Sequence, residues 1–185
     1  MSFVARNHPQ QVGARGADDD TDDRRTPSAI FDPLHAEHGF TIDVAASAAN
    51  AKLPRFFDRF EDGLSRSWAG EVVWCNPPYS ALFAWVEKAL AEVRCGCLKV
   101  VMLLPSNRTE QRWWQELIEP VRDRGLGVAT RHLRGRTKFD GPAGAIKPKK
   151  STSPLSHGGG IRPPFGCVVV VIEPLRATPG AGGST

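Results

Sequence analysis

Four consecutive residues, Asn76-Pro77-Pro78-Tyr79, follow an apolar run at 72–74 and offer several groups that accept hydrogen bonds. The side-chain amide of Asn76 supplies an oxygen, and Pro77 supplies a carbonyl with no N–H beside it. Two prolines in a row fix the backbone, and preorganised acceptors stabilise a growing positive charge. Tyr79 adds a ring face on which a flipped base can stack. The four residues therefore suit methyl transfer to a planar exocyclic amine such as that of adenine.

A proline turn that merely ends a strand is the alternative interpretation of the same four residues. Their position favours a functional role, because they separate a predicted strand at 72–74 from a predicted amphipathic helix at 81–94. Sheets of parallel strands bind ligands at the carboxyl ends of those strands. The tetrapeptide falls at such an end.

The remaining elements alternate along the chain. Apolar runs predict strands at 40–46, 72–74, 98–104, 128–133 and 167–172. Helical turns are expected across 27–38, with Thr26 as an N-cap, and a further helix is expected from Thr109 to Pro120 or Gly125. This alternation predicts an α/β fold with a mostly parallel sheet and helices on both faces.

The domain organisation follows from composition. Residues 1–25 are polar, with an acidic run at 18–23, and are predicted to form a disordered arm. One domain is expected at 26–173. Within it, residues 140–165 are rich in Gly, Pro, Lys and Ser and predict a flexible basic insertion. Residues 174–185 are predicted to be a disordered tail.

Charge is distributed unevenly. The chain carries a net +4, whereas residues 121–176 hold 11 lysines and arginines against three acidic residues, a net +8. Such a basic half suggests a polyanionic partner, nucleic acid being the commonest, although a solvated surface gives the same composition. No apolar run approaches the roughly 20 residues of a membrane span, and no signal peptide is evident. The four cysteines indicate buried, reduced thiols, so a cytoplasmic protein is expected.

Several basic residues are candidates for DNA contact, with an ordinary surface loop as the alternative for each. Arg108 follows the predicted strand 98–104, and a tight turn is expected around Gly135. The candidates are Arg108, Arg136, Lys138, Lys147, Lys149 and Lys150. His35 and His38 have the spacing of a helical metal pair, but no third ligand is evident, so no metal site is expected.

Beyond these patterns, the chain resembles a known family. The blocks "TPSAIFDPLHAEHGFTIDVAASAANAKLPRFF", "EDGLSRSWAGEVVWCNPPYS", "VVMLLPSNRTEQRWW" and "LRGRTKF" are similar to the small phage-type (Dam-like) DNA N6-adenine methyltransferases. The resemblance covers about residues 26–173. It implies a Rossmann-like methyltransferase fold, S-adenosylmethionine as the cofactor and double-stranded DNA as the partner. It also suggests a phage enzyme that protects DNA from restriction.

Carried over to this sequence, the resemblance makes Asn76, Pro77, Pro78 and Tyr79 the catalytic motif. It also implies a set of cofactor-binding residues: Asp43, Val44, Ala45, Ala46, Thr26, Pro27, Asn50 and Asp62. The chain departs from methyltransferases in general in one respect, since no glycine follows the first strand at 43–47.

Other functions fit part of the sequence. The same tetrapeptide occurs in enzymes that methylate a glutamine side chain in protein, and RNA adenine is a close variant of the DNA substrate. An inactive, basic DNA-binding protein on a methyltransferase scaffold is a further alternative. No obligate protein partner is evident from the sequence.

Overall fold

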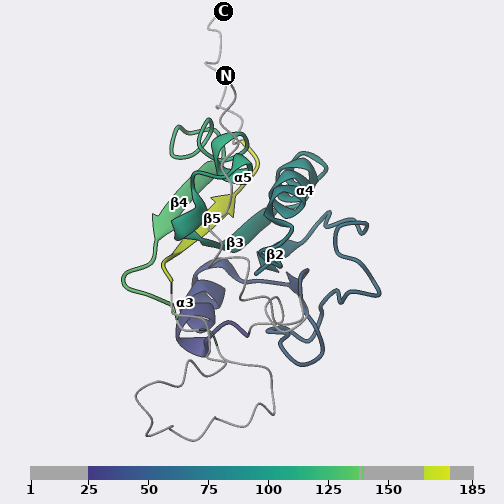
Figure 1. Ribbon diagram of the computed structural model, residues 1–185. Helices are drawn as coiled ribbons and strands as arrows, with labels where there is room; N and C mark the ends of the chain where they lie inside the picture. The colour runs from purple at the N-terminus through teal and green to yellow at the C-terminus, as the bar shows by residue number, and fades with distance from the viewer. Residues whose placement is uncertain (1–24, 138, 140–164, 176–185) are drawn as a thin grey trace, which may run out of the picture.

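The computed structural model describes residues 25–137, 139 and 165–175 of the chain (Figure 1). Its strands are β1 (Ile42–Asp43), β2 (Val72–Cys75), β3 (Lys99–Pro105), β4 (Val128–His132) and β5 (Cys167–Ile172). Its helices are α3 (Ser28–His38), α4 (Leu82–Arg94) and α5 (Arg112–Gln115), with a 3-10 turn, η1 (Ser106–Arg108). The predicted arm, basic insertion and tail fall almost wholly outside the described residues.

The five strands form one mixed sheet in the order β1-β2-β3-β5-β4. β1, β2 and β3 pair in parallel, whereas β5 is antiparallel to both β3 and β4. Four strands therefore run in one direction and β5 runs in the other. The prediction of a mostly parallel sheet is confirmed, and the strand that runs against the others is β5. All but one residue of β5 is buried, and a strand buried on both faces has the same apolar pattern in either direction.

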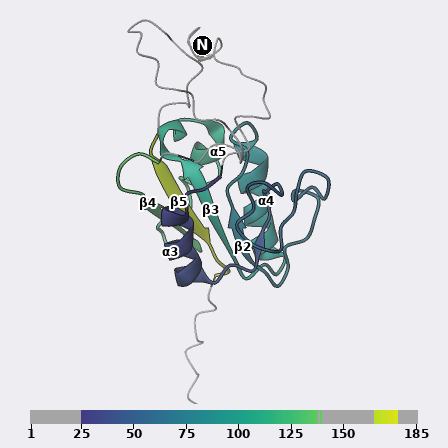
Figure 2. The ribbon, with the colours of Figure 1, turned by 90° about the horizontal axis from the view of Figure 1, so that it is seen from below.

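Helices cover both faces of the sheet, as predicted (Figure 2). Successive strand residues point to opposite faces. Met102 and Leu104 belong to the core beneath α4 and α5, whereas Val101 and Leu103 belong to the core beneath α3. The central strand β3 thus lies between two hydrophobic layers.

Two helices differ from their predicted form. Pro27, rather than Thr26, is the N-cap residue of α3, and α3 continues through Pro33 as a single helix. Its predicted end at Gly39 is confirmed, because Gly39 adopts a left-handed conformation (φ 68°) and its N–H donates to the carbonyl of His35. The predicted helix after Thr109 is reduced to the four residues of α5, with turns following it.

Over the described residues, no helix is both long enough and apolar enough to cross a membrane. Within the same ranges, no group of three or more His, Cys, Asp or Glu side chains is arranged to hold a metal ion. His35 has a structural role instead: its Nδ1 accepts a hydrogen bond from the backbone N–H of Phe40 at 3.2 Å, and its ring stacks on Phe31.

Candidate active site

Three strand ends meet at one edge of the sheet. β1 ends at Asp43, and the N–H of the next residue, Val44, donates to the carbonyl of Trp74 at 3.1 Å. β2 ends at Cys75, immediately before Asn76. β3 leads into η1, from which the Nη1 of Arg108 donates to the carbonyl of Tyr79 at 3.4 Å. The segments predicted to bind a cofactor and to act on a substrate are therefore neighbours.

The motif itself leaves a carbonyl group open. Pro77 is buried, while the other three residues of 76–79 are partly buried. The carbonyl of Pro78 accepts a hydrogen bond from the N–H of Ala81 at 3.1 Å, in the turn that leads to α4. No hydrogen bond to the carbonyl of Pro77 is found among the described residues. That oxygen is available to an amine brought to this edge.

Two phenylalanines that were not among the predicted site residues contact the ring of Tyr79. Phe139 and Phe165 meet the ring of Tyr79 edge-on, with ring centroids 6.4 and 5.7 Å away. They stack on each other at 5.6 Å, although 26 positions separate them along the chain. Phe139 lies in the "LRGRTKF" block, but nothing in the local pattern indicated that it would pair with Phe165.

The hydroxyl of Tyr79 is directed into the protein. Burial raises the pKa of the Cys167 thiol, and hydrogen bonds from the side chains of Thr137 and Tyr79 oppose that rise. Thr137 is itself buried, and its N–H donates to the carbonyl of Phe165 at 2.8 Å. These contacts fix the orientation of the Tyr79 ring relative to the strand ends.

Among the residues that the structure describes, Asp43 is the buried carboxylate at this edge. Its side chain accepts hydrogen bonds from the N–H groups of Ala45 (3.4 Å) and Lys52 (3.1 Å) and so shapes the loop after β1. Burial raises the pKa of Asp43 to about 6, despite these two hydrogen bonds. Its charge also adds to the burial that raises the pKa of Cys75, the residue before Asn76. The carboxylate therefore lies close to the start of the motif.

The raised pKa of Asp43 predicts that ionisation of this carboxyl lowers the stability of the folded protein as pH rises. The folded protein holds the Asp43 proton more tightly than the unfolded chain, whose carboxyl titrates near 3.8. The resulting stabilisation is fully present below pH 3.8 and is lost as pH rises through about 6. The loss amounts to about 3 kcal/mol. Asp43→Asn lacks this ionisation. The difference in free energy of unfolding between the variant and the native protein should therefore shift in favour of the variant by about 3 kcal/mol between pH 4 and 7.

Urea unfolding across this pH range, without added ligand, measures the difference. Asp32→Asn makes the same change in charge on the exposed surface of α3 and serves as the control. Curves for Asp43→Asn and the native protein that run parallel from pH 4 to 7 would contradict the prediction.

Gly63 packs its backbone directly against the first residue after β1. A Cβ at Gly63 would collide with the carbonyl oxygen of Val44 and lie 3.1 Å from the ring of Trp85. The carbonyl of Gly63 accepts a hydrogen bond from the indole of the fully buried Trp68 at 2.9 Å. The segment around Gly63 therefore lies in direct backbone contact with the loop that follows β1.

The structure describes six other predicted cofactor residues. Asn50 accepts a hydrogen bond from the N–H of Ser47 at 2.7 Å, and Asp62, at φ 52°, accepts one from the N–H of Leu64 at 3.2 Å. Thr26 is buried and Pro27 begins α3. Ala45 and Ala46 are partly buried beside Asp43. Roles of these residues in cofactor binding remain predictions.

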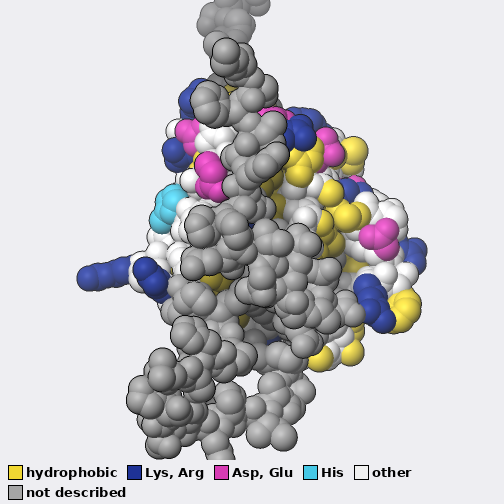
Figure 3. All heavy atoms as spheres, viewed as in Figure 1, with side chains coloured by type: hydrophobic (Ala, Val, Ile, Leu, Met, Phe, Trp, Pro, Cys, Tyr) yellow, Lys and Arg dark blue, Asp and Glu magenta, His cyan; other side chains and the backbone are white. Residues whose placement is uncertain are grey.

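The predicted DNA-contacting residues are only partly described. Arg108 is partly buried against the motif, and Arg136 is exposed. Lys138, Lys147, Lys149 and Lys150 lie outside the described residues. On the face shown in Figure 3, basic and acidic side chains are interspersed rather than separated.

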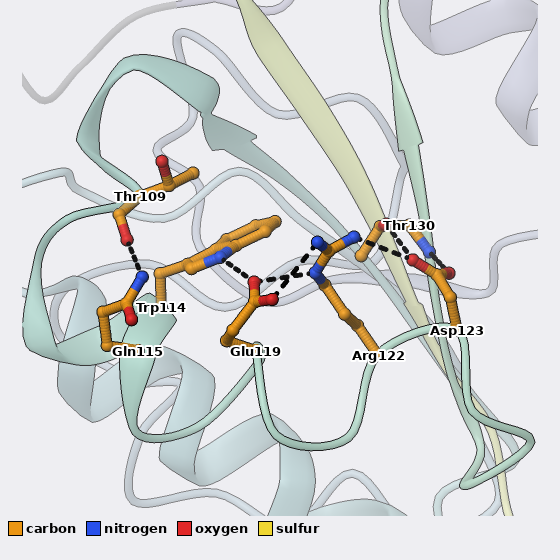
Figure 4. Close-up of polar contacts among 7 residues, drawn as sticks. All are labelled: Thr109, Trp114, Gln115, Glu119, Arg122, Asp123 and Thr130. Carbon is orange, nitrogen blue, oxygen red and sulfur yellow. Dashed lines mark hydrogen bonds and ion pairs between the residues drawn. The ribbon is translucent and has the colours of Figure 1, made fainter.

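One cavity, of about 370 Å³, lies beside α5 and β4, and Asn76 is not among its lining residues. The carboxylate of Glu119 accepts hydrogen bonds from the indole of Trp114 (2.7 Å) and from Nε of Arg122 (2.8 Å). Arg122 also pairs with Asp123, which binds Thr130 (Figure 4). This network fixes the turns between α5 and β4, and its charged groups are already paired. A second cavity, of about 230 Å³, is lined in part by Tyr79.

Comparison with known proteins agrees with these features. The family model described as DNA N-6-adenine-methyltransferase (Dam) matches residues 13–151. A DNA N-6-adenine-methyltransferase of Escherichia phage T1 is 31% identical over 93 residues, which is 49% of this chain and 38% of the phage protein. One from Haemophilus phage HP1 (strain HP1c1) is 34% identical over 65 residues, 35% of this chain and 38% of the relative. The matched segments thus span well under half of these relatives.

Proposed function

Because the chain belongs to the DNA N-6-adenine-methyltransferase (Dam) family, we propose that it transfers a methyl group from S-adenosylmethionine to the N6 amine of an adenine in double-stranded DNA. The observation that carries this proposal is the arrangement at the sheet edge. The open carbonyl of Pro77 and the side chain of Asn76 follow β2, directly beside the buried carboxylate that ends β1.

The cofactor matches the residues at the end of β1. S-adenosylmethionine carries a positively charged sulfur, which makes its methyl group electrophilic. A buried carboxylate whose pKa is raised to about 6 is stabilised in its ionised form by a cation placed beside it. Ala45 and Ala46 follow with small, partly buried side chains, and Gly63 packs against the Val44 carbonyl. Asp43 and residues 44–46 are therefore our candidates for holding the cofactor.

The residues proposed to bind the methyl acceptor, adenine, have a different task from those that hold the cofactor. The lone pair of the adenine amine is delocalised into the ring, so the amine is a poor nucleophile. The oxygens of Asn76 and Pro77 would accept its two N–H groups and stabilise the positive charge on nitrogen as the new C–N bond forms. The proton is lost after transfer, so no strong base is needed beforehand. Tyr79 would stack on the adenine once it has left the duplex.

The proposal extends to the fold. Helices on both faces, three parallel strands and ligand residues at the strand carboxyl ends support a Rossmann-like methyltransferase fold.

A methyl-transfer assay tests this function. The purified protein is incubated with S-adenosylmethionine and unmethylated DNA, and the DNA is then digested to nucleosides that are separated by mass. We expect N6-methyladenine. Methylated RNA adenine or protein glutamine, without a DNA product, would redirect the function to those acceptors. Absence of both product and cofactor binding would leave an inactive DNA-binding scaffold.

The basic insertion provides a separate prediction. Replacing Lys147, Lys149 and Lys150 by alanine should weaken DNA binding equally for all sequences. The slope of log affinity against log salt should fall by about 0.9 for each lysine that contacts a phosphate. Binding measured from 50 to 200 mM salt checks this. The triple lysine-to-arginine variant keeps the charge and should keep the slope, and an unchanged slope in the alanine variant would remove these residues from the interface.

A further inference from the structure

The cavity of about 230 Å³ adjoins the proposed acceptor site and has no role in the mechanism above. Its walls come from three places: Tyr79 after β2, Phe83 in the first turn of α4, and Gln111, Arg112 and Trp113 at the start of α5. Pockets that enclose a whole small-molecule ligand measure roughly 300–1,000 Å³. This one is better suited to part of a polymer that continues beyond it.

The polar groups available in this cavity are hydrogen-bond donors. The indole N–H of Trp113 donates to Oε1 of Gln111 at 3.1 Å. This contact orients the side-chain amide of Gln111, whose NH₂ group can then donate to a ligand. Arg112 uses Nε and Nη2 to bind Glu116 at 2.8 and 2.9 Å. Neither the NH₂ of Gln111 nor the Nη1 of Arg112 has a partner within the described part of the chain. Two adjacent donors favour a ligand with acceptor atoms.

Aromatic rings lie beside these donors. The guanidinium of Arg112 lies over the ring of Phe83, 4.9 Å from its centroid, and Trp113 is buried just behind. Rings, a stacked guanidinium and outward-facing donors together are the features that bind nucleotides in single-stranded or unstacked form.

We infer that this cavity binds the nucleotide adjacent to the target adenine, through acceptor atoms of its phosphate or of its base. The inference rests on the proposed function, because Tyr79 lines the cavity and is also the proposed platform for the adenine. The neighbouring nucleotide is covalently joined to the adenine, so the DNA strand must continue past Tyr79 on one side of its ring. Gln111 and Arg112 supply the polar contacts on this side.

Steady-state methylation of a short duplex by Gln111→Ala and Arg112→Ala tests the inference. Both residues are exposed, and thermal unfolding checks that the variants remain folded. We expect each variant to raise KM for DNA by at least about fivefold, with kcat and cofactor affinity unchanged. Arg94→Ala removes the same charge from an exposed residue in the last turn of α4, and its KM should stay within about twofold.

Two further readouts distinguish the sources of the acceptor atoms. If Arg112 binds a phosphate, its loss lowers the salt slope by about 1 and weakens all flanking sequences equally. If Gln111 and Arg112 bind a base, the penalty is confined to duplexes carrying one particular base beside the adenine. Variants that retain the native KM, salt slope and flanking-base preference, in an enzyme that methylates DNA, would overturn the inference alone. A native protein that methylates no DNA would instead overturn the proposed function.

Discussion

Replacing Asn76 by alanine is expected to lower kcat for DNA methylation by about 10²- to 10³-fold. This is the usual effect of removing one preorganised hydrogen-bonding group that acts on a charge developed in the transition state. Asn76 is only partly buried and follows β2 rather than lying in it, so its truncation should leave the sheet intact. Cofactor affinity should also be retained, because the proposed cofactor residues belong to the loop after β1.

Single-turnover methylation, cofactor titration and thermal unfolding together check this prediction. Asn107→Ala is the matched control: it removes the same amide from an exposed residue in η1, at the end of the neighbouring strand. We expect Asn107→Ala to methylate at nearly the native rate. An Asn76→Ala protein that methylates as fast as the native one would show that the acceptor oxygens lie elsewhere.

The sequence predicted the elements that position the site because each has a strong local signal. β2, α4 and β3 were predicted to within two residues, from continuous apolar runs and from helical spacing. Their alternation placed Asn76 and Arg108 at strand carboxyl ends, and the contact between Arg108 and Tyr79 confirms that these ends are neighbours. Asp43 was selected through the family resemblance instead: the predicted strand at 40–46 ran past it, whereas β1 ends there.

The features that the sequence did not reveal depend on contacts between distant residues. The direction of β5 leaves no trace in an apolar run. Gly63 packs against the carbonyl of Val44, with Trp68 and Trp85 beside it. Phe139 and Phe165 stand near opposite ends of the long connection between β4 and β5, and both contact Tyr79. In each case, a local pattern carries no information about the partner across the fold.

Tyr79 should contribute the second-largest effect, through its ring rather than its hydroxyl. Stacking between a base and an aromatic side chain is worth about 1–3 kcal/mol, so Tyr79→Leu should lower kcat, and with it kcat/KM, for DNA by roughly 5- to 150-fold. Leucine keeps an apolar side chain against Phe139 and Phe165 and limits the cavity that alanine would leave. Tyr79→Phe keeps the ring and should remain within about threefold of native activity, even though it removes the buried hydroxyl near Cys167.

A substrate that flips easily separates stacking from chemistry. An adenine opposite an abasic position has lost its pairing partner, so less energy is needed to take it out of the duplex. If Tyr79 stabilises the flipped adenine, the kcat defect of Tyr79→Leu should largely disappear on this substrate. The defect of Asn76→Ala should persist, because Asn76 is proposed to act on the methyl-transfer step itself. An equal Tyr79→Leu defect on both duplexes would mean that the ring aligns the amine with Asn76 rather than holding the flipped base.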